Sequence, residues 1–339
     1  MHHNQTKTYQ GVPFSVLDLA PVLEGEEPKH SFKNSVKLAQ ATEKLGFNRY
    51  WLAEHHNMPG IASSATSLLI AHLAQHTHTM RIGSGGIMLP NHAALIIAEQ
   101  FGTLASLFPN RIDLGLGRAP GTDQATAFAL RRTLNQQVDD FPNQVIELEN
   151  YFSDTPLGSV QAVPGRGLNV PLWLLGSSDY SARLAAEKGL PFSFASHFAP
   201  QYMMEALKIY HENFKPSHAL SKPYVMLGIN IITSDTDEDA RYIATSQQQQ
   251  VVYLRRNQPT KLQPPVKDIT SLVTAAEKEM LDKMYHSNTT IIGDMSVVKE
   301  KVDALLAATK ADELIINSQV FDINKRVYSY QLISDLFND

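Results

Sequence analysis

Residues 111–121 read Arg-Ile-Asp-Leu-Gly-Leu-Gly-Arg-Ala-Pro-Gly, a β-prone run that loses its side chains at Gly115 and Gly117. Arg118 then stands where the chain must turn, because Pro120 and Gly121 do not continue a regular strand. This pattern is typical of a buried strand whose carboxyl end lies against a flat, anionic ligand.

Similar short apolar runs alternate with helical patterns along the chain. The pattern predicts strands at residues 14–20, 49–56, 81–89, 111–117, 172–175, 192–198, 224–233 and 314–317. Nearly all are separated by segments with apolar residues at helical spacing. Because strands and helices alternate, we predict an α/β fold with a parallel sheet. The strand count favours closure into a TIM (β/α)8 barrel over an open sheet.

The length of the chain, 339 residues, suits one barrel with insertions. Two connections are long, at 119–144 after the fourth strand and at 234–290 after the seventh. Long loops at the functional face of a barrel form lids or cavity walls. We expect a single domain over 1–339, with a flexible N-terminus at 1–12 and a lid or insertion at 234–290. Within that lid, the run Gln247–Gln250 predicts a solvent-facing helix.

Composition excludes several classes of function. The net charge of −5 and the lack of a basic cluster argue against a nucleic-acid partner. The chain has no cysteine, so redox chemistry would need a bound cofactor. No apolar run approaches the roughly 18 residues that span a bilayer, and no signal segment is visible, so we expect a cytoplasmic protein without a membrane partner.

The glycines of the central stretch do not form a dinucleotide fingerprint. In GxGxxG the third glycine would fall on Pro120, and the similar run at 83–86 fails because residue 88 is methionine. Two interpretations remain open. The glycines either narrow a barrel strand for packing, or flatten a wall against which an aromatic cofactor lies.

A phosphate site is suggested by two separate stretches. Arg118 would point its five donors into the barrel mouth, where a phosphate could accept two of them, although an ion pair with Asp123 is the alternative. The run Gly176-Ser177-Ser178 leads into an expected helix, whose free backbone N–H groups and serine hydroxyls suit an anion. The alternative for the serines is helix capping. We include Tyr180, which follows in the same helix, in the predicted cofactor site.

The densest titratable cluster is Glu54-His55-His56. Adjacent strand residues point to opposite faces, so the two histidines would not hold one metal ion in a regular strand, and we predict no metal site. A histidine at the barrel mouth suits proton transfer, because its pKa lies near neutrality. We place Asp18, His56 and His197 in the substrate pocket, because each falls at the carboxyl end of a predicted strand.

Four motifs together resemble those of the bacterial luciferase-like flavin monooxygenases, and most closely the single-chain members of unassigned substrate. The motifs are Trp51–His56, Gly83–Pro90 followed by His92 and Glu99, Asn110–Arg118, and Leu175–Ser178. They stand in the family's order, and the likeness covers almost the whole chain from Phe14.

The resemblance implies a barrel that binds FMN, receives it reduced from a separate reductase, and uses O2 to oxidise a small organic substrate through a flavin hydroperoxide. By that likeness Arg118, Ser177 and Ser178 hold the phosphate, and Gly85-Gly86 runs under the flavin ring across a cis peptide bond. His55 carries over as the catalytic histidine, and we place Glu54 beside it in the catalytic site. The resemblance also implies a homodimer, which the apolar helix predicted at 63–74 would suit.

The sequence departs from the light-emitting members at Gly117, where they have a reactive cysteine, and this argues against light emission. Three alternatives remain open. The barrel could use the deazaflavin F420 for hydride transfer, although its longer acidic tail would need extra cations at the mouth. The protein could also bind flavin without turnover, or be a metal-dependent hydrolase.

Overall fold

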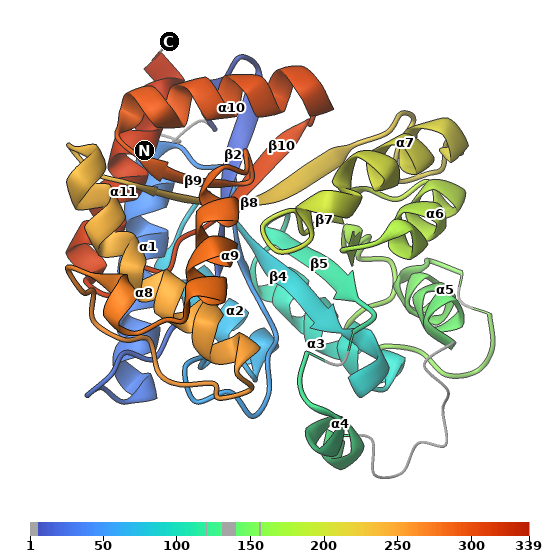
Figure 1. Ribbon diagram of the computed structural model, residues 1–339. Coiled ribbons are helices and arrows are strands. Elements are labelled where there is room, and N and C mark those ends of the chain that lie inside the picture. The colour runs from blue at the N-terminus through green and yellow to red at the C-terminus, as the bar shows by residue number, and fades with distance from the viewer. Residues whose placement is uncertain (1–5, 120, 131–139, 156, 339) are drawn as a thin grey trace.

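The computed structural model describes residues 6–119, 121–130, 140–155 and 157–338. Within these ranges eight parallel strands close a barrel, because the last of them pairs with the first (Figure 1). In barrel order the strands are β2 (Val12–Asp18), β3 (Arg49–Leu52), β4 (Arg81–Met88), β5 (Ile112–Gly117), β6 (Leu172–Gly176), β7 (Phe192–Phe194), β8 (Val225–Thr233) and β10 (Glu313–Asn317). The predicted TIM barrel and its eight strands are confirmed.

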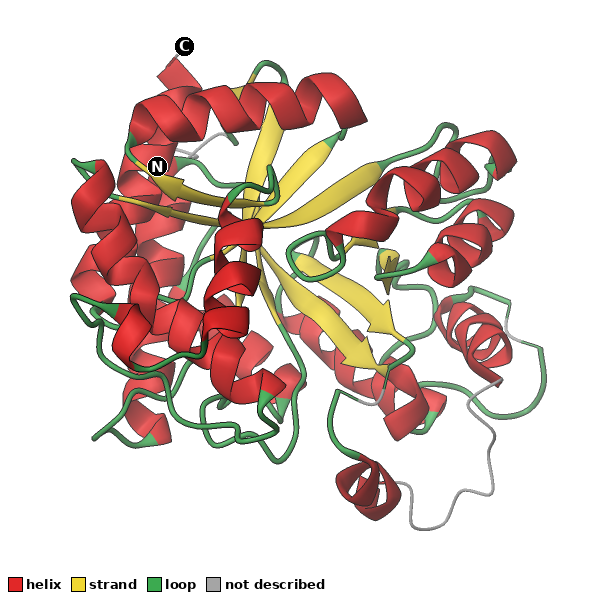
Figure 2. Ribbon diagram, in the orientation of Figure 1, coloured by secondary structure: helices red, strands yellow, loops and turns green. Residues whose placement is uncertain are grey.

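Helices surround the barrel and cover the outer faces of its strands (Figure 2). Glycines in the left-handed conformation end two of them, since Gly46 and Gly189 have φ of 94° and 65°. The helices are α1 (Pro28–Leu45), α2 (Thr66–His76), α3 (Ala94–Leu107), α4 (Gln124–Leu130), α5 (Phe141–Phe152), α6 (Asp179–Lys188), α7 (Met203–Asn213), α8 (Asp237–Arg255), α9 (Ala275–Tyr285), α10 (Met295–Thr309) and α11 (Ile323–Ser334).

The amino-terminal end of the barrel is filled by a buried ion cluster. The guanidinium of Arg49 donates to Asp113 at 2.8 Å and to Glu313 at 2.8 Å. Arg81 also donates to Asp113, and the Arg49 guanidinium lies 4.8 Å from the ring centroid of Trp173. Burial raises the pKa of Asp113, but the two arginines outweigh it and hold that pKa below its usual range. Among the described residues this cluster fills the amino end of the barrel, so we expect a ligand to bind at the carboxyl end.

Two strands end four residues earlier than the sequence predicts. The strand expected at 49–56 ends at Leu52, and the one expected at 192–198 ends at Phe194. In the second case Ala195 still donates to the carbonyl of Gly176, but the chain then turns, since the N–H of Phe198 bonds back to Ala195. The residues beyond each strand are thereby freed to line the barrel mouth.

The N-terminal segment is more ordered than expected. Strand β1 (Thr8–Tyr9) pairs antiparallel with β2, and the Tyr9 hydroxyl donates to Asp303 at 2.6 Å. Tyr9 is only 2% exposed. The prediction of a flexible segment over 1–12 is wrong for residues 8–12, because they form this hairpin, while residues 1–5 lie outside the described ranges.

The expected lid is largely helical. It contains α8 and α9 and ends at β9 (Thr290–Gly293), which pairs with β8 outside the closed barrel. The prediction of a solvent-facing helix at 247–250 is wrong, because Gln247, Gln248 and Gln249 are buried where α8 packs on the barrel. Of the other long connection, at 119–144, the described part includes α4, while Pro120 and residues 131–139 are outside the described ranges.

Candidate functional site

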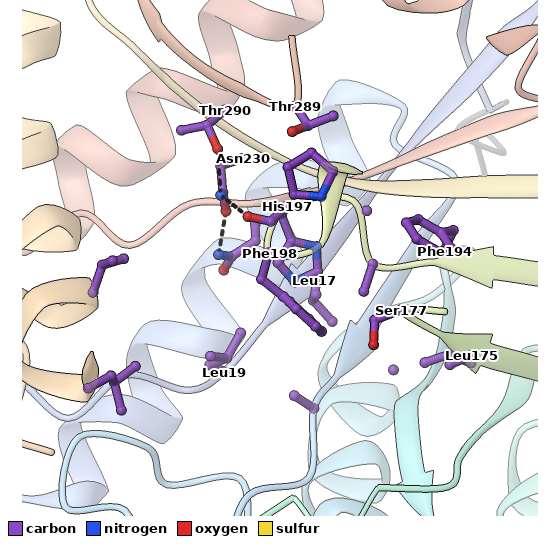
Figure 3. Close-up of a pocket in the computed structure, with 18 of the residues that line it drawn as sticks. Leu17, Leu19, Leu175, Ser177, Phe194, His197, Phe198, Asn230, Thr289 and Thr290 are labelled. Carbon is purple, nitrogen blue, oxygen red and sulfur yellow. Dashed lines mark hydrogen bonds between the residues drawn. The ribbon is translucent and has the colours of Figure 1, made fainter. Parts of the chain in front are cut away.

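A cavity of about 1000 Å³ lies at the carboxyl end of the barrel, between the strand ends and the lid helices α8 and α9 (Figure 3). This is the end at which TIM barrels place their chemistry. Much of its wall is apolar, from Leu17, Leu19, Met58, Ile61, Leu175, Phe194, Leu254, Met280 and Met284. A cavity with such a lining suits an organic ligand.

One wall of the cavity is formed by glycines. The sequence left open whether they serve strand packing or form a flat wall for a cofactor, and the two interpretations apply to different residues. Gly85 and Gly117 line the cavity, and the Gly85–Gly86 peptide is cis, as the resemblance implies. A Cβ on Gly86 would lie 2.7 Å from the carbonyl oxygen of Gly115, and one on Gly115 would lie 2.2 Å from that of Ser84. Gly86 and Gly115 therefore serve strand packing, because a Cβ there would meet the backbone. A Cβ on Gly85 or Gly117 would meet instead the side chain of Leu17 at 2.9 Å or of Met88 at 2.7 Å, both in the cavity wall.

Arg118 projects from the end of β5 and lines the same cavity. Its guanidinium carbon lies 4.0 Å from the ring centroid of Tyr180, a cation–π contact that holds the side chain in place. Asp123 instead accepts from Asn57 and Thr126. Among the described residues Arg118 has no carboxylate partner, so its donors remain for a ligand. Tyr180 does not itself line the cavity and acts through Arg118.

The N-terminus of α6 lies beside Arg118. Gly176, Ser177 and Ser178 all line the cavity, and Ser178 is the residue before the first helical position. Its side chain makes no capping hydrogen bond, so the capping alternative is not what the structure has. Asp179 in the first turn is paired with Arg183. The N–H groups at the start of α6, the two hydroxyls and Arg118 thus lie together at the cavity, and all are groups that can donate to an anion.

Two histidines face the cavity from different strand ends. His55 bonds through Nδ1 to the carbonyl oxygen of Gly121 at 3.2 Å. A carbonyl only accepts, so Nδ1 carries the proton of the neutral ring and Nε2 keeps its lone pair. Burial lowers the pKa of His55, and burial together with nearby His55 lowers the pKa of His197 to about 4. Both rings are neutral at pH 7.

Glu54 does not face the cavity, which corrects its predicted place in the catalytic site. It is 1% exposed and accepts from the main-chain N–H of Met88 at 2.9 Å and from Nε2 of His56 and His92 at 2.8 and 2.9 Å. Burial raises its pKa, but the bonds from the histidines outweigh this and keep the pKa low. Glu54 thus joins the ends of β3 and β4 and positions the segment that carries His55.

His56 is likewise outside the cavity lining, because its ring turns to Glu54. The prediction that His56 lies in the substrate pocket is therefore wrong. His92 stands in one of the four motifs, yet its role as a second partner of Glu54 was not visible in the sequence.

Asp18 is also directed away from the cavity. Its carboxylate accepts from Arg326 at 3.0 Å and from Tyr50 at 2.6 Å, and it is fully buried. Burial raises its pKa, but the charge of Arg326 and the hydrogen bonds from Ser35, Tyr50 and Arg326 together outweigh this and hold the pKa below its usual value. Successive strand residues alternate between the two faces of a strand, and Leu17 is the one that lines the cavity. The predicted pocket role of Asp18 is therefore wrong.

Several polar cavity residues were not predicted. Asn230 and Asn317 stand within apolar strands, and a polar residue in a buried strand is the signal that could have identified them. Figure 3 shows Asn230 hydrogen-bonded to Thr290 and to the carbonyl of His197, in the wall of the cavity. The unpredicted polar lining residues include Ser181, Ser193, Gln201, Asn230, Gln247, Gln250, Thr290, Asn317 and Gln319.

Within the described residues, no cluster of three or more histidine, aspartate or glutamate side chains could hold a metal ion. A search of the same residues finds no helix with the length and apolar character needed to cross a membrane.

A family model described as luciferase-like monooxygenase matches residues 12–313. The chain belongs to the luciferase-like monooxygenase family. It is 50% identical to the uncharacterized protein YvbT of Bacillus subtilis, over the full length of both chains. It is 49% identical to a luciferase-like monooxygenase of Escherichia coli, over 97% of this chain and 98% of that one. The N-acetyl-S-alkylcysteine monooxygenase of Bacillus subtilis is 31% identical, with 96% and 98% covered.

Three solved structures have the same barrel. The crystal structure of apo-MsnO8 is 31% identical and covers 96% of this luciferase-like chain and 98% of its own, with a TM-score of 0.87. The oxygenating constituent of a 3,6-diketocamphane monooxygenase from Pseudomonas putida, solved with FMN, has a TM-score of 0.72 at 17% identity, with 95% and 96% covered. An F420-dependent secondary alcohol dehydrogenase has a TM-score of 0.65 at 13% identity, with 96% and 98% covered. The last two show a shared fold alone.

Proposed function

We propose that the protein is an FMN-dependent monooxygenase that uses reduced FMN and O2 to oxidise a small organic substrate. One observation carries the proposal, namely the anion site of Arg118 and the α6 N-terminus beside the glycine wall of the same cavity. An anion site next to a flat wall fits a phosphate joined to an aromatic ring system. The FMN complex of the 3,6-diketocamphane enzyme supports this choice as an example from the same fold.

The chain's own groups fit FMN in detail. The phosphate would accept from Arg118, from the hydroxyls of Ser177 and Ser178, and from the N–H groups that begin α6. Gly85 and Gly117 would leave room for the ring, since neither has a side chain to occupy the cavity. Reduced FMN supplies the electrons that activate O2. Arg255 and Lys283 also line the cavity, but the proposed phosphate site needs only Arg118 and the α6 N-terminus, which suits a mononucleotide.

The remaining groups act on protons and on water. Nε2 of His55 is a neutral base directed by the Gly121 carbonyl, and it would accept or return a proton near the reacting atoms. Glu54 holds the segment of His55 in position without touching the ligand. The apolar walls and the lid helices would limit the access of water to the reacting atoms.

We also propose that a separate reductase supplies the reduced FMN, since relatives include the oxygenase component of a flavin-dependent trigonelline monooxygenase. A homodimer through α2 is a further proposal, supported by Leu68, which is 70% exposed on that helix.

Equilibrium titration of the purified protein with FMN, riboflavin and F420 tests the proposal. We expect FMN to bind at micromolar concentration and more tightly than riboflavin, because only FMN has the phosphate. Preferred binding of F420 would favour the hydride-transfer alternative, and no binding of any flavin would contradict the proposal. Oxygen uptake with reduced FMN, stimulated by members of a substrate panel, separates an enzyme from a flavin-binding protein without turnover.

A further inference from the structure

The two lid helices each present one side to the cavity. On α8 the lining residues are Gln247, Gln250, Val251, Leu254 and Arg255, and on α9 they are Ala276, Glu279, Met280, Lys283 and Met284. Within each set the positions recur at a spacing of three and four residues, which places them along one side of the helix. Arg255 and Lys283 therefore belong to the cavity-facing sides of α8 and α9, the helices at the barrel mouth in Figure 1.

The cavity-facing side of α8 becomes more exposed toward the end of the helix. Gln247 is 6% exposed, whereas Leu254 is 43% exposed. Arg255, the last residue of α8, is also exposed. Buried apolar side chains such as Leu17 and Phe194 line the deeper part of the cavity. The cavity thus has an apolar interior and a cation at its rim.

Two neighbouring arginines of α8 differ in how they are paired. Arg256 is not part of the cavity lining, and it donates to both carboxylate oxygens of Glu277 in the first turn of α9, at 2.8 and 2.7 Å. Arg255 has no hydrogen-bond or ion-pair partner among the described residues, and Lys283 has only the exposed Glu279 on its own helix, at 2.7 Å. The donors of Arg255 are therefore available to a ligand, as those of Arg118 are.

The charge of the cavity lining is opposite in sign to that of the whole chain. The chain has a net charge of −5, whereas the charged residues of the lining are Arg118, Arg255, Lys283 and Glu279. A cleft with an excess of positive charge attracts anions and raises their local concentration. The FMN phosphate would use Arg118, so Arg255 remains for a second anion.

We propose that the substrate is an organic acid, with an apolar body in the deeper part of the cavity and a carboxylate bound by Arg255 at the rim. This inference rests on the proposed function, because it concerns the substrate of the same cavity. A guanidinium can donate to both oxygens of a carboxylate at once. The phosphate and the carboxylate would then be held by different elements, the first at β5 and α6 and the second on the lid helix α8.

Matched ligand pairs test the proposal on the wild-type protein saturated with FMN. Calorimetric titration compares octanoate with octanamide and phenylacetate with phenylacetamide, pairs that differ in charge but little in shape. We expect each acid to bind about fivefold more tightly than its amide, the effect of an ion pair that solvent screens, and added salt to reduce the preference. Equal affinities within the pairs, or no binding of the acids, would overturn the proposal. FMN saturation, recorded first from flavin fluorescence, reports separately on the proposed function.

Variants of equal charge assign the effect to Arg255. Arg255→Ala should abolish the preference for the acids and leave FMN affinity unchanged. Arg241→Ala removes another exposed cation of α8, one outside the cavity lining, and should keep the preference. Retention of the preference in Arg255→Ala, or an equal loss in Arg241→Ala, would contradict the assignment. If FMN did not bind, the same ligand pairs on Arg118→Ala protein would still test Arg255, because the other unpaired cation is then removed.

Discussion

The buried ion cluster at the amino end of the barrel and the cavity wall at the carboxyl end differ in how their charged groups are paired. At the amino end, Arg49, Asp113 and Glu313 are buried and bonded to one another. At the carboxyl end, Arg118 has no carboxylate partner among the described residues, and the Ser178 side chain makes no capping bond. Paired groups stabilise the fold, whereas groups without a protein partner are available to a ligand. At the carboxyl end, pairing state therefore separates the side chains that face away from the cavity, such as Glu54 and Asp18, from those that are left for a ligand.

The largest effect on stability should come from disrupting the buried ion cluster at the amino end of the barrel. Arg49→Leu leaves the carboxylates of Asp113 and Glu313 buried with too little positive charge, and we expect a loss of about 3–5 kcal/mol in the free energy of unfolding. Urea denaturation measures it. As a control, Arg241→Ala breaks an exposed pair with Asp237 and should cost under about 1 kcal/mol. Similar losses in both variants would mean that the buried cluster is not a special source of stability.

At the open end, Arg118→Ala should leave the free energy of unfolding nearly unchanged and weaken FMN binding by about 1.5–3 kcal/mol, through loss of a charged hydrogen bond. Riboflavin, which lacks the phosphate, should bind equally to the variant and the wild type. Arg255→Ala, which removes another cation of the cavity lining on α8, is the matched control and should keep FMN affinity. An equal loss for FMN and riboflavin would show that Arg118 does not bind the phosphate.

Acid should lower the free energy of unfolding through His197, which lines the cavity at the carboxyl end of the barrel. The pKa of this ring is lowered from 6.5 to about 4 in the folded state, so on acidification the unfolded chain takes up the proton first. The contribution of the neutral His197 ring to the free energy of unfolding is fully present above pH 6.5. It is lost as the pH falls toward about 4. We expect a loss on the order of 2 kcal/mol across that window. Denaturation curves of His197→Gln should show a flatter pH dependence, and an unchanged slope would contradict the prediction.

The smallest effect expected is that of Ser178→Ala, which removes one hydroxyl of the anion site and should weaken FMN binding by about 0.5–1.5 kcal/mol. Stability should change little, because this serine makes no capping bond. Asp294→Ala gives the opposite result, since Asp294 accepts from two N–H groups at the start of α10. It should lower the free energy of unfolding by about 1 kcal/mol and leave FMN binding intact. A stability loss in Ser178→Ala without an affinity loss would contradict the account.

The sequence predicted what depends on local pattern. Alternating apolar periodicity was enough for the eight strands, and the glycine and serine runs next to strand ends located Arg118, Ser177 and Ser178 at the cavity. These predictions succeeded because every strand of a parallel barrel ends at the same face, so order along the chain becomes position in space.

Predictions from the sequence were wrong where a side chain could point either into the cavity or away from it. Glu54 and Asp18 lie at strand ends, but they turn to His92 and Arg326, which are distant in the sequence. The glutamines of α8 have the composition of a solvated helix, yet packing on the barrel buries them. Such outcomes depend on which partner the closed barrel brings near, and a local pattern does not contain that information.

The most direct measurement of the central claim is a crystal structure of the protein with FMN. The account predicts the phosphate bonded to Arg118 and to the N-terminus of α6, the flavin ring against Gly85 and Gly117, and the buried cluster around Arg49 unchanged. A phosphate bound elsewhere in the cavity, with Arg118 still stacked on Tyr180 and free of the ligand, would contradict it.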